Sequence, residues 1–277
     1  METVIAFPGQ SEFEGARALL ASLAAPCRII SPEPAYSKVG VPALVTDSSG
    51  HAAILESAPT FICAGWAEYR PAHSRVPQSL PSEFEQDIFG RSAIVFLGRC
   101  MADKTKVRLI AHISGNMEAV LPYINTEMPQ ACYNRATPCL TFLDEYRMVT
   151  LYSRRIAVGK ADHLLDSWRV LEKIRCLVNR TWSRRAGIPP CYEMRQKPPA
   201  VEVYKRLPRT NCRACGELTC MAFAARLWRG EGTPSECPAV SSGEFRHLWP
   251  ALVEICSGLG ISEQARSDSD REGPYDF

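Results

Sequence analysis

The sequence predicts an α+β protein, with two small α/β-type sandwich domains followed by a small, mainly helical domain. Three observations carry this prediction. Residues 3–46 alternate short apolar runs with an amphipathic helix pattern, residues 93–159 hold several strand-like runs, and residues 220–230 combine helix-forming residues with neighbouring cysteines. With 277 residues, 46% of them hydrophobic, the chain is long enough for two or three such domains with buried cores.

The first predicted domain covers residues 1–80 and is a small βαβ unit. Its expected elements are strands at 3–7, 27–30 and 43–46 and a helix at 11–25. Ser11 and Glu14 have the spacing of a capping box, which predicts the start of that helix. The apolar stripe expected to face the core consists of Phe13, Ala16, Leu20 and Leu23. We expect this domain to be a docking or structural module.

The second predicted domain covers residues 85–186 and follows a proline-rich linker at 71–82. Its expected elements are an antiparallel sheet with strands at 93–100, 107–114, 138–143, 147–152 and 155–159, a short helix at 114–124 and a long helix ending near 185. Asp162 is the expected N-cap of the long helix. The residues expected on its apolar face are Leu164, Trp168, Leu171, Ile174, Arg175, Leu177 and Val178.

The C-terminal part is predicted to be a proline-rich tether at 187–203, a small cysteine-containing domain at 204–260 and a disordered tail at 261–277. The run from Cys220 to Gly230 is rich in helix formers and ends on a glycine, which predicts a helix. Its expected apolar face consists of Met221, Ala224, Ala225 and Trp228. A closing helix is expected over 245–255.

Four cysteines of this domain have the spacing of a metal-cluster site. Cys212, Cys215, Cys220 and Cys237 are separated by two, four and sixteen residues, and Pro238 follows the last of them. A Cys-x-x-Cys turn directs two thiolates toward one centre, and Gly216 supplies backbone freedom there. The positive end of the helix that begins at Cys220 favours a negatively charged thiolate cluster. Four cysteine thiolates, with a proline after the last, are typical of iron–sulfur ligation.

The stretch LPRTNCRACGELTCMAFAARLWRGEGTPSECP resembles the small iron–sulfur domain of the corrinoid iron–sulfur protein large subunit and of a subunit of the Rnf electron-transport complex. The remainder of the chain resembles uncharacterised iron–sulfur-binding proteins of anaerobic prokaryotes. The resemblance implies one 4Fe–4S cluster bound by Cys212, Cys215, Cys220 and Cys237. It is carried by the family pattern, which is present here as Leu207, Pro208, Thr210, Asn211, Gly216, Ala222, Phe223, Ala224, Glu236 and Pro238 around the four cysteines.

A structural zinc site and disulfide pairing are the alternatives that four cysteines leave open. Zinc ribbons usually carry two Cys-x-x-Cys knuckles, whereas this sequence has one. The eight remaining cysteines are scattered singly, which is unlike a secreted disulfide framework and indicates a reducing cytoplasm. We expect each of these eight to be a small buried side chain rather than a ligand.

Several cations surround the cysteine motif. Two interpretations are open: these side chains are ordinary solvated surface, or they are functional cations that offset the negative charge of a cluster and raise its potential, or dock an acidic redox partner. The cations are Lys205, Arg206, Arg209, Arg213, Arg226 and Arg229.

Composition and motifs argue against several classes of function. The net charge of +2 argues against a nucleic-acid partner, and the chain lacks the apolar run of a membrane span. Phosphate-binding loops, dinucleotide-binding glycine patterns and zinc-protease motifs are absent from the sequence, so an autonomous enzyme is not expected. We expect single-electron transfer to or within a larger anaerobic metalloenzyme system, whose redox protein or enzyme complex is the partner. The alternative is an accessory, assembly or permanent subunit with a structural or transferable cluster.

Overall fold

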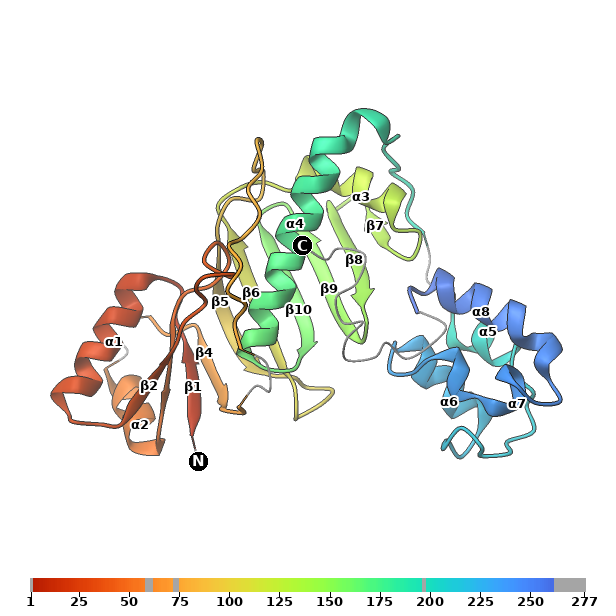
Figure 1. Cartoon of the computed structure of the whole chain (residues 1–277), viewed down its shortest axis with the longest axis horizontal. Helices are drawn as coiled ribbons and strands as arrows, with labels where there is room; N and C mark the ends of the chain where they lie inside the picture. The colour runs from red at the N-terminus through yellow and green to blue at the C-terminus, as the bar shows by residue number, and fades with distance from the viewer. Residues whose placement is uncertain (1, 58–61, 72–74, 196–197, 262–277) are drawn as a thin grey trace. The chain divides into compact units, whose positions relative to one another are not determined.

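The computed structural model of the chain describes residues 2–57, 62–71, 75–195 and 198–261 (Figure 1). The chain divides into two compact units. Unit 1 comprises Met1–Leu121 and Thr150–Pro189, and unit 2 comprises Pro122–Val149 and Pro190–Phe277. Both contain helices and strands, which confirms the α+β class.

Unit 1 is built on a mixed sheet whose strands are ordered β2-β3-β1-β4-β5-β6-β10, with the C-terminal half of β9 beside β10. The strands are β1 (Thr3–Ala6), β2 (Cys27–Ile30), β3 (Ala43–Thr46), β4 (Gly65–Glu68), β5 (Ser92–Arg99), β6 (Val107–Ile113), β9 (Arg147–Tyr152) and β10 (Arg155–Ala161). From β2 to β10, neighbouring strands pair antiparallel except β4 with β5, which pair parallel. The strands predicted at the N-terminus and in the second domain are therefore present, within a residue or two at their ends.

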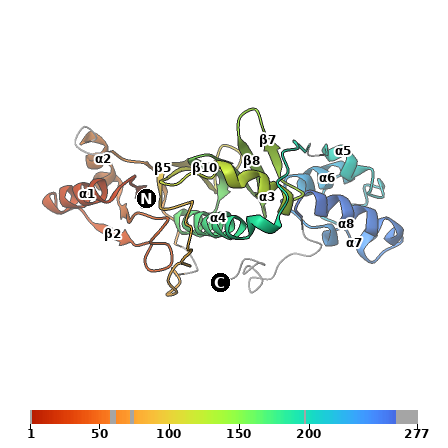
Figure 2. The ribbon, with the colours of Figure 1, turned by 90° about the horizontal axis from the view of Figure 1, so that it is seen from above.

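The helices of unit 1 are α1 (Gln10–Ser22), α2 (Ser48–Glu56) and α4 (Leu164–Arg184), with 3-10 turns η1 (Glu118–Val120) and η2 (Arg185–Gly187). Helix α4 packs on β10 and lies along one face of the strands (Figure 2). Its expected apolar residues are all buried, and Arg175 among them is held by Glu172 at 2.7 Å. The apolar side of α1 packs with β1, β3 and α2 in a core that includes Ile5, Phe13 and Leu44.

Two predicted caps are wrong. Helix α1 begins at Gln10 behind the N-cap Gly9, so Ser11 lies inside the helix and its hydroxyl donates to Glu12. Helix α4 is capped by His163, whose Nδ1 accepts the backbone N–H of Asp166 at 3.1 Å, and Asp162 pairs instead with Lys106.

The prediction that Leu23 belongs to the apolar stripe of α1 is also wrong. Leu23 is the C-cap of α1 and is 54% exposed, because the helix stops before its side chain can join the core.

Unit 2 combines a hairpin region with a group of short helices, seen together in Figure 2. Its elements are α3 (Leu121–Glu127), β7 (Cys132–Asn134), β8 (Cys139–Asp144), the first half of β9, α5 (Ala200–Tyr204), α6 (Cys220–Trp228), η3 (Pro234–Glu236), α7 (Pro238–Ser241), η4 (Arg246–Leu248) and α8 (Trp249–Gly258). β7 pairs antiparallel with β8, and β8 is next to β9 in the strand order. The predicted helix near 114–124 is present as η1 and α3.

The segment expected to be a tether is fastened at several points. The side-chain amide of Asn125 donates to the carbonyl of Cys191 at 2.9 Å, and Arg195 donates to the Asn125 carbonyl at 2.5 Å. Farther along, Trp228 Nε1 donates to the Pro198 carbonyl at 2.7 Å. These contacts tie the segment to α3 and α6, although proline-rich composition alone indicates a loose connection.

The predicted domain boundaries stay predictions. Across the first of them, β4 and β5 are hydrogen-bonded neighbours through Gly65 and Leu97. The tail predicted to be disordered lies, beyond Ile261, outside the described residues. None of the helices in the described ranges has the length and apolar character needed to cross a membrane.

Candidate iron–sulfur site

Helix α6 places Cys220 at its first residue. The hydroxyl of Thr219 accepts the backbone N–H of Ala222 at 3.0 Å and caps the helix, and Gly230, with a φ of 73°, ends it. The predicted helix is confirmed, but its predicted face is partly wrong. The buried residues of the helix include Phe223, Ala224 and Leu227, whereas Met221 is 41% exposed.

The loop that carries Cys212 and Cys215 has an unusual backbone. Arg209, Asn211 and Arg213 adopt left-handed conformations with φ of 62°, 52° and 63°. A left-handed residue next to a right-handed one turns successive N–H groups toward one side, and such concave backbone binds anions, including iron–sulfur clusters. Non-glycine residues adopt these angles where surrounding contacts enforce them.

One such contact joins the loop to the helix. Asn211 Oδ1 accepts the backbone N–H of Cys220 at 2.8 Å, which satisfies one of the free N–H groups of the first turn of α6. Asn211 thereby fixes the position of Cys212, its chain neighbour, relative to Cys220.

Cys237 is presented between two short helical turns. η3 is stabilised by a capping box in which the backbone N–H of Thr233 donates to Glu236 Oε1 at 2.7 Å. Cys237 then caps α7, and its carbonyl accepts the N–H groups of Val240 and Ser241 at 3.0 and 2.9 Å. The turn returns the chain to the helix that carries Cys220.

Arg226 connects the three segments that carry the cysteines. It projects from α6, forms an ion pair with Glu236 next to Cys237, and lies 3.3 Å from Glu217 in the loop after Cys215. The Arg226 guanidinium also lies over the ring of Phe223 in the same helix, with 5.3 Å between its Cζ and the ring centroid. Sequence reasoning places Arg226 among the surface cations and gives Asn211 no structural role, because neither contact follows from helical spacing.

The four cysteines differ in burial in a graded way. Cys220 and Cys237 belong to the apolar core of the helical group and are 8% and 5% exposed, and Cys215 packs against that core. Cys212 is exposed. The thiols therefore lie at the edge of the core, with the Cys212 side toward solvent.

The thiols also interact electrostatically. Burial raises the pKa of Cys237, a backbone N–H opposes this, and the thiols of Cys215, Cys212 and Cys220 raise the pKa further. The backbone N–H of Ala214 and the hydroxyl of Thr210 hold the pKa of the Cys212 thiol below its usual value. Thiolate ligands repel one another, and a cationic iron–sulfur core would neutralise that repulsion when bound.

Other observations leave the ligand assignment a prediction. Across the described residues, no group of three or more His, Cys, Asp or Glu side chains is found that could hold a metal ion. All twelve cysteines lie in the described ranges, and none of them forms a disulfide. Of the eight outside the motif, three are buried as expected, namely Cys100, Cys176 and Cys256. The expectation is wrong for Cys27, which is exposed, and the other four are only partly buried.

Comparison with protein families decides the class of this segment. Residues 207–239 match the family described as "Putative Fe-S cluster". This C-terminal iron–sulfur segment contains all four motif cysteines. No solved structure significantly matches the chain.

Curated relatives match 22–23% of this chain. The gamma subunit of the acetyl-CoA decarbonylase/synthase complex of Methanosarcina acetivorans is 58% identical over 69 residues, which cover 22% of this chain and 15% of the relative. The corresponding subunit of Methanocaldococcus jannaschii is 39% identical over 64 residues, covering 23% and 13%. The corrinoid/iron-sulfur protein large subunit of Moorella thermoacetica is 49% identical over 64 residues, covering 22% and 14%. The match thus spans about a seventh of the length of these relatives.

Proposed function

We propose that the iron–sulfur segment binds one 4Fe–4S cluster through Cys212, Cys215, Cys220 and Cys237. The match of residues 207–239 to an iron–sulfur family carries this proposal. The joining of the three cysteine-bearing segments by Asn211 and Arg226 supports it.

We further propose that the protein passes single electrons to or from a larger metalloenzyme complex of anaerobic one-carbon metabolism. The relatives that match 22–23% of the chain are named as a subunit of the acetyl-CoA decarbonylase/synthase complex and as a corrinoid/iron-sulfur protein large subunit. When bound, the cluster supplies one-electron oxidation and reduction. The chain buries Cys220 and Cys237 and leaves Cys212 exposed, so the Cys212 side is the side from which a partner approaches.

The surface beside Cys212 has the character of a docking face for an acidic partner. Arg209 and Arg213 are exposed on either side of it in sequence, and Leu218 is 70% exposed nearby in the same loop. Cations of this kind accelerate association with a negatively charged partner in a salt-dependent way.

The docking face can be tested with single charge reversals. Arg209→Glu and Arg213→Glu should each slow electron exchange with the partner at low salt, and Arg246→Glu, an exposed cation elsewhere in the same helical group, should not. Equal rates for all three variants and the unaltered protein would remove the docking face.

The first test of the cluster is metal content. Protein purified without oxygen should contain about four irons and four acid-labile sulfides per chain and give an electron-spin resonance signal after dithionite reduction. Cys220→Ser should lower the iron content, whereas Cys256→Ala, which removes a buried thiol from the same core, should retain it. One zinc and no sulfide would overturn the redox proposal.

An accessory role in cluster assembly is the second candidate function. The exposure of Cys212 favours it, because an acceptor protein can reach this proposed cluster ligand. The two roles differ in cluster lability. An electron carrier keeps its iron through repeated reduction and oxidation in the presence of an apo-acceptor protein, whereas an assembly protein transfers it.

A further inference from the structure

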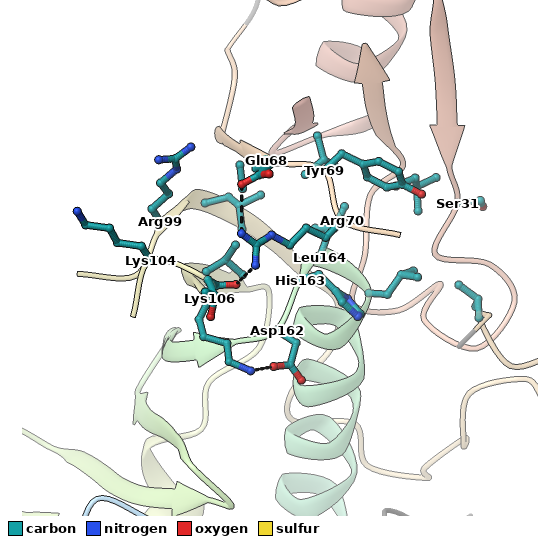
Figure 3. A pocket seen from close by; sticks show the side chains of 18 of the residues that line it. Ser31, Glu68, Tyr69, Arg70, Arg99, Lys104, Lys106, Asp162, His163 and Leu164 are labelled. Carbon is teal, nitrogen blue, oxygen red and sulfur yellow. Dashed lines mark hydrogen bonds and ion pairs between the residues drawn. The ribbon is translucent and has the colours of Figure 1, made fainter. Parts of the chain in front are cut away.

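Unit 1 contains a cavity of about 330 Å³ that is separate from the cysteine site. It is formed where β1, β4 and β5 meet the loop between β5 and β6 and the start of α4 (Figure 3). Its volume is at the lower end of the range for small-molecule sites, roughly 300–1,000 Å³.

The floor of the cavity is apolar and comes from the sheet. Val4 and Ala67 are register partners on β1 and β4, and Leu97 follows on β5 with Val107 on β6. All four side chains are at most 7% exposed, and Leu164 of α4 adds to the same surface. A surface of this kind accommodates the apolar or planar part of an organic molecule.

The rim is cationic. Arg70 follows β4, Arg99 ends β5, Lys104 and Lys106 lie in the loop after β5, and Arg75 also lines the cavity. Figure 3 shows Arg99 and Lys104 projecting from the same side of the cavity. Two carboxylates of the described residues also line it.

Both carboxylates are already engaged. Glu68 forms an ion pair with Arg70 at 3.2 Å, and Asp162 forms one with Lys106. The Arg70 guanidinium also donates a hydrogen bond to the carbonyl of Thr105 at 3.2 Å. Within the described residues, this leaves three rim cations without an ion-pair partner, namely Arg75, Arg99 and Lys104.

We propose that this cavity binds a phosphorylated organic molecule, with its apolar or planar part on the sheet floor and its phosphates against Arg99 and Lys104. Arginine recognises phosphate through paired N–H donors and lysine through point charge, and several unpaired cations together suit a ligand with two or more negative charges. The site is independent of the cluster and adds a small-molecule ligand to the protein.

The test is isothermal titration calorimetry on the full chain with five probes: ADP, AMP, adenosine, pyrophosphate and octanoate. ADP should bind more tightly than AMP, and both more tightly than adenosine or pyrophosphate, because only the nucleotides use both floor and rim. Arg99→Ala/Lys104→Ala should weaken ADP binding by about tenfold or more. Arg17→Ala/Arg154→Ala is the matched control, since it removes two exposed cations that do not line the cavity, and it should bind ADP as the unaltered protein does.

Three results would overturn the proposal. They are no ADP binding, an equal loss of affinity in both double variants, or pyrophosphate binding as tightly as ADP. Binding of octanoate without ADP would likewise exclude a phosphorylated ligand. Circular dichroism of the variants verifies that folding is retained.

Discussion

Asn211 Oδ1 accepts the backbone N–H of Cys220 at 2.8 Å, so a left-handed loop residue satisfies a free N–H group in the first turn of the helix that carries the third cysteine. Replacing Asn211 with Ala leaves that N–H unsatisfied, and we expect a loss of about 1 kcal/mol in the free energy of unfolding. Iron release to a chelator should also accelerate, because the loop loses its link to α6.

A matched control for this prediction is Asn116→Ala. Asn116 Oδ1 also accepts a nearby backbone N–H, that of Glu118 at 2.9 Å, but in unit 1. It should lower stability to a similar extent without changing the rate of iron release. Similar iron release from both variants would show that Asn211 has no specific effect on the site.

Arg226 is expected to stabilise the site through its two carboxylates. Its side chain is 24% exposed and is paired with Glu217 and Glu236. Arg226→Gln should lower the free energy of unfolding by about 1 kcal/mol, at the upper end of the range for partly exposed ion pairs. Arg229→Gln, which breaks a pair with the near neighbour Glu231, should have almost no effect. Urea denaturation compares the two variants, and equal midpoints would contradict a bridging role.

Gly230 cannot be replaced without strain. Its φ is 73°, and a Cβ at this position would lie 2.6 Å from the Glu145 carbonyl oxygen. We expect Gly230→Ala to lower the free energy of unfolding by about 1–3 kcal/mol. Gly258→Ala is the control, because nothing lies within 4 Å of its Cβ position and it is in helix α8; it should stabilise by about 0.5–1 kcal/mol. A thermal melt in which both variants behave alike would disprove the backbone argument.

The stability of unit 1 should depend on the ionisation of Asp47. The backbone N–H of Gly50 and the hydroxyl of Ser49 hold the pKa of Asp47 below its usual value at the start of α2. Because the pKa is depressed in the folded state, the stabilisation is complete above the unfolded value of about 4 and is lost as pH falls through the folded value.

This dependence can be measured with Asp47→Asn. The difference in urea midpoint between the variant and the unaltered protein should shrink as pH falls below about 4. A difference that stays constant between about pH 6 and pH 3 would show that Asp47 does not act through its charge.

The long helices and strands can be predicted from the sequence, because burial of one face places apolar residues at a regular spacing along the chain. In α4, Leu164, Trp168 and Leu171 recur at helical spacing, and all three are buried. The elements α2, β4 and β7 escape prediction, because each buries only one or two residues and so shows no clear apolar period in the sequence. The N-cap of α4 could not be predicted from the sequence, because Asp162 and His163 both have side chains that can cap a helix. In the folded protein Asp162 pairs with Lys106, and His163 caps the helix.

For the candidate site, the sequence by itself determined the four cysteines, their spacing and the iron–sulfur class, because ligand spacing is a local property of the chain. The tertiary structure decided that Cys220 and Cys237 lie in the apolar core while Cys212 faces solvent, and that Asn211 and Arg226 join the segments. It also decided the cationic cavity of unit 1, whose lining is drawn from residues 4–165. Residues that far apart in sequence meet through strand pairing and helix packing, which no local pattern encodes.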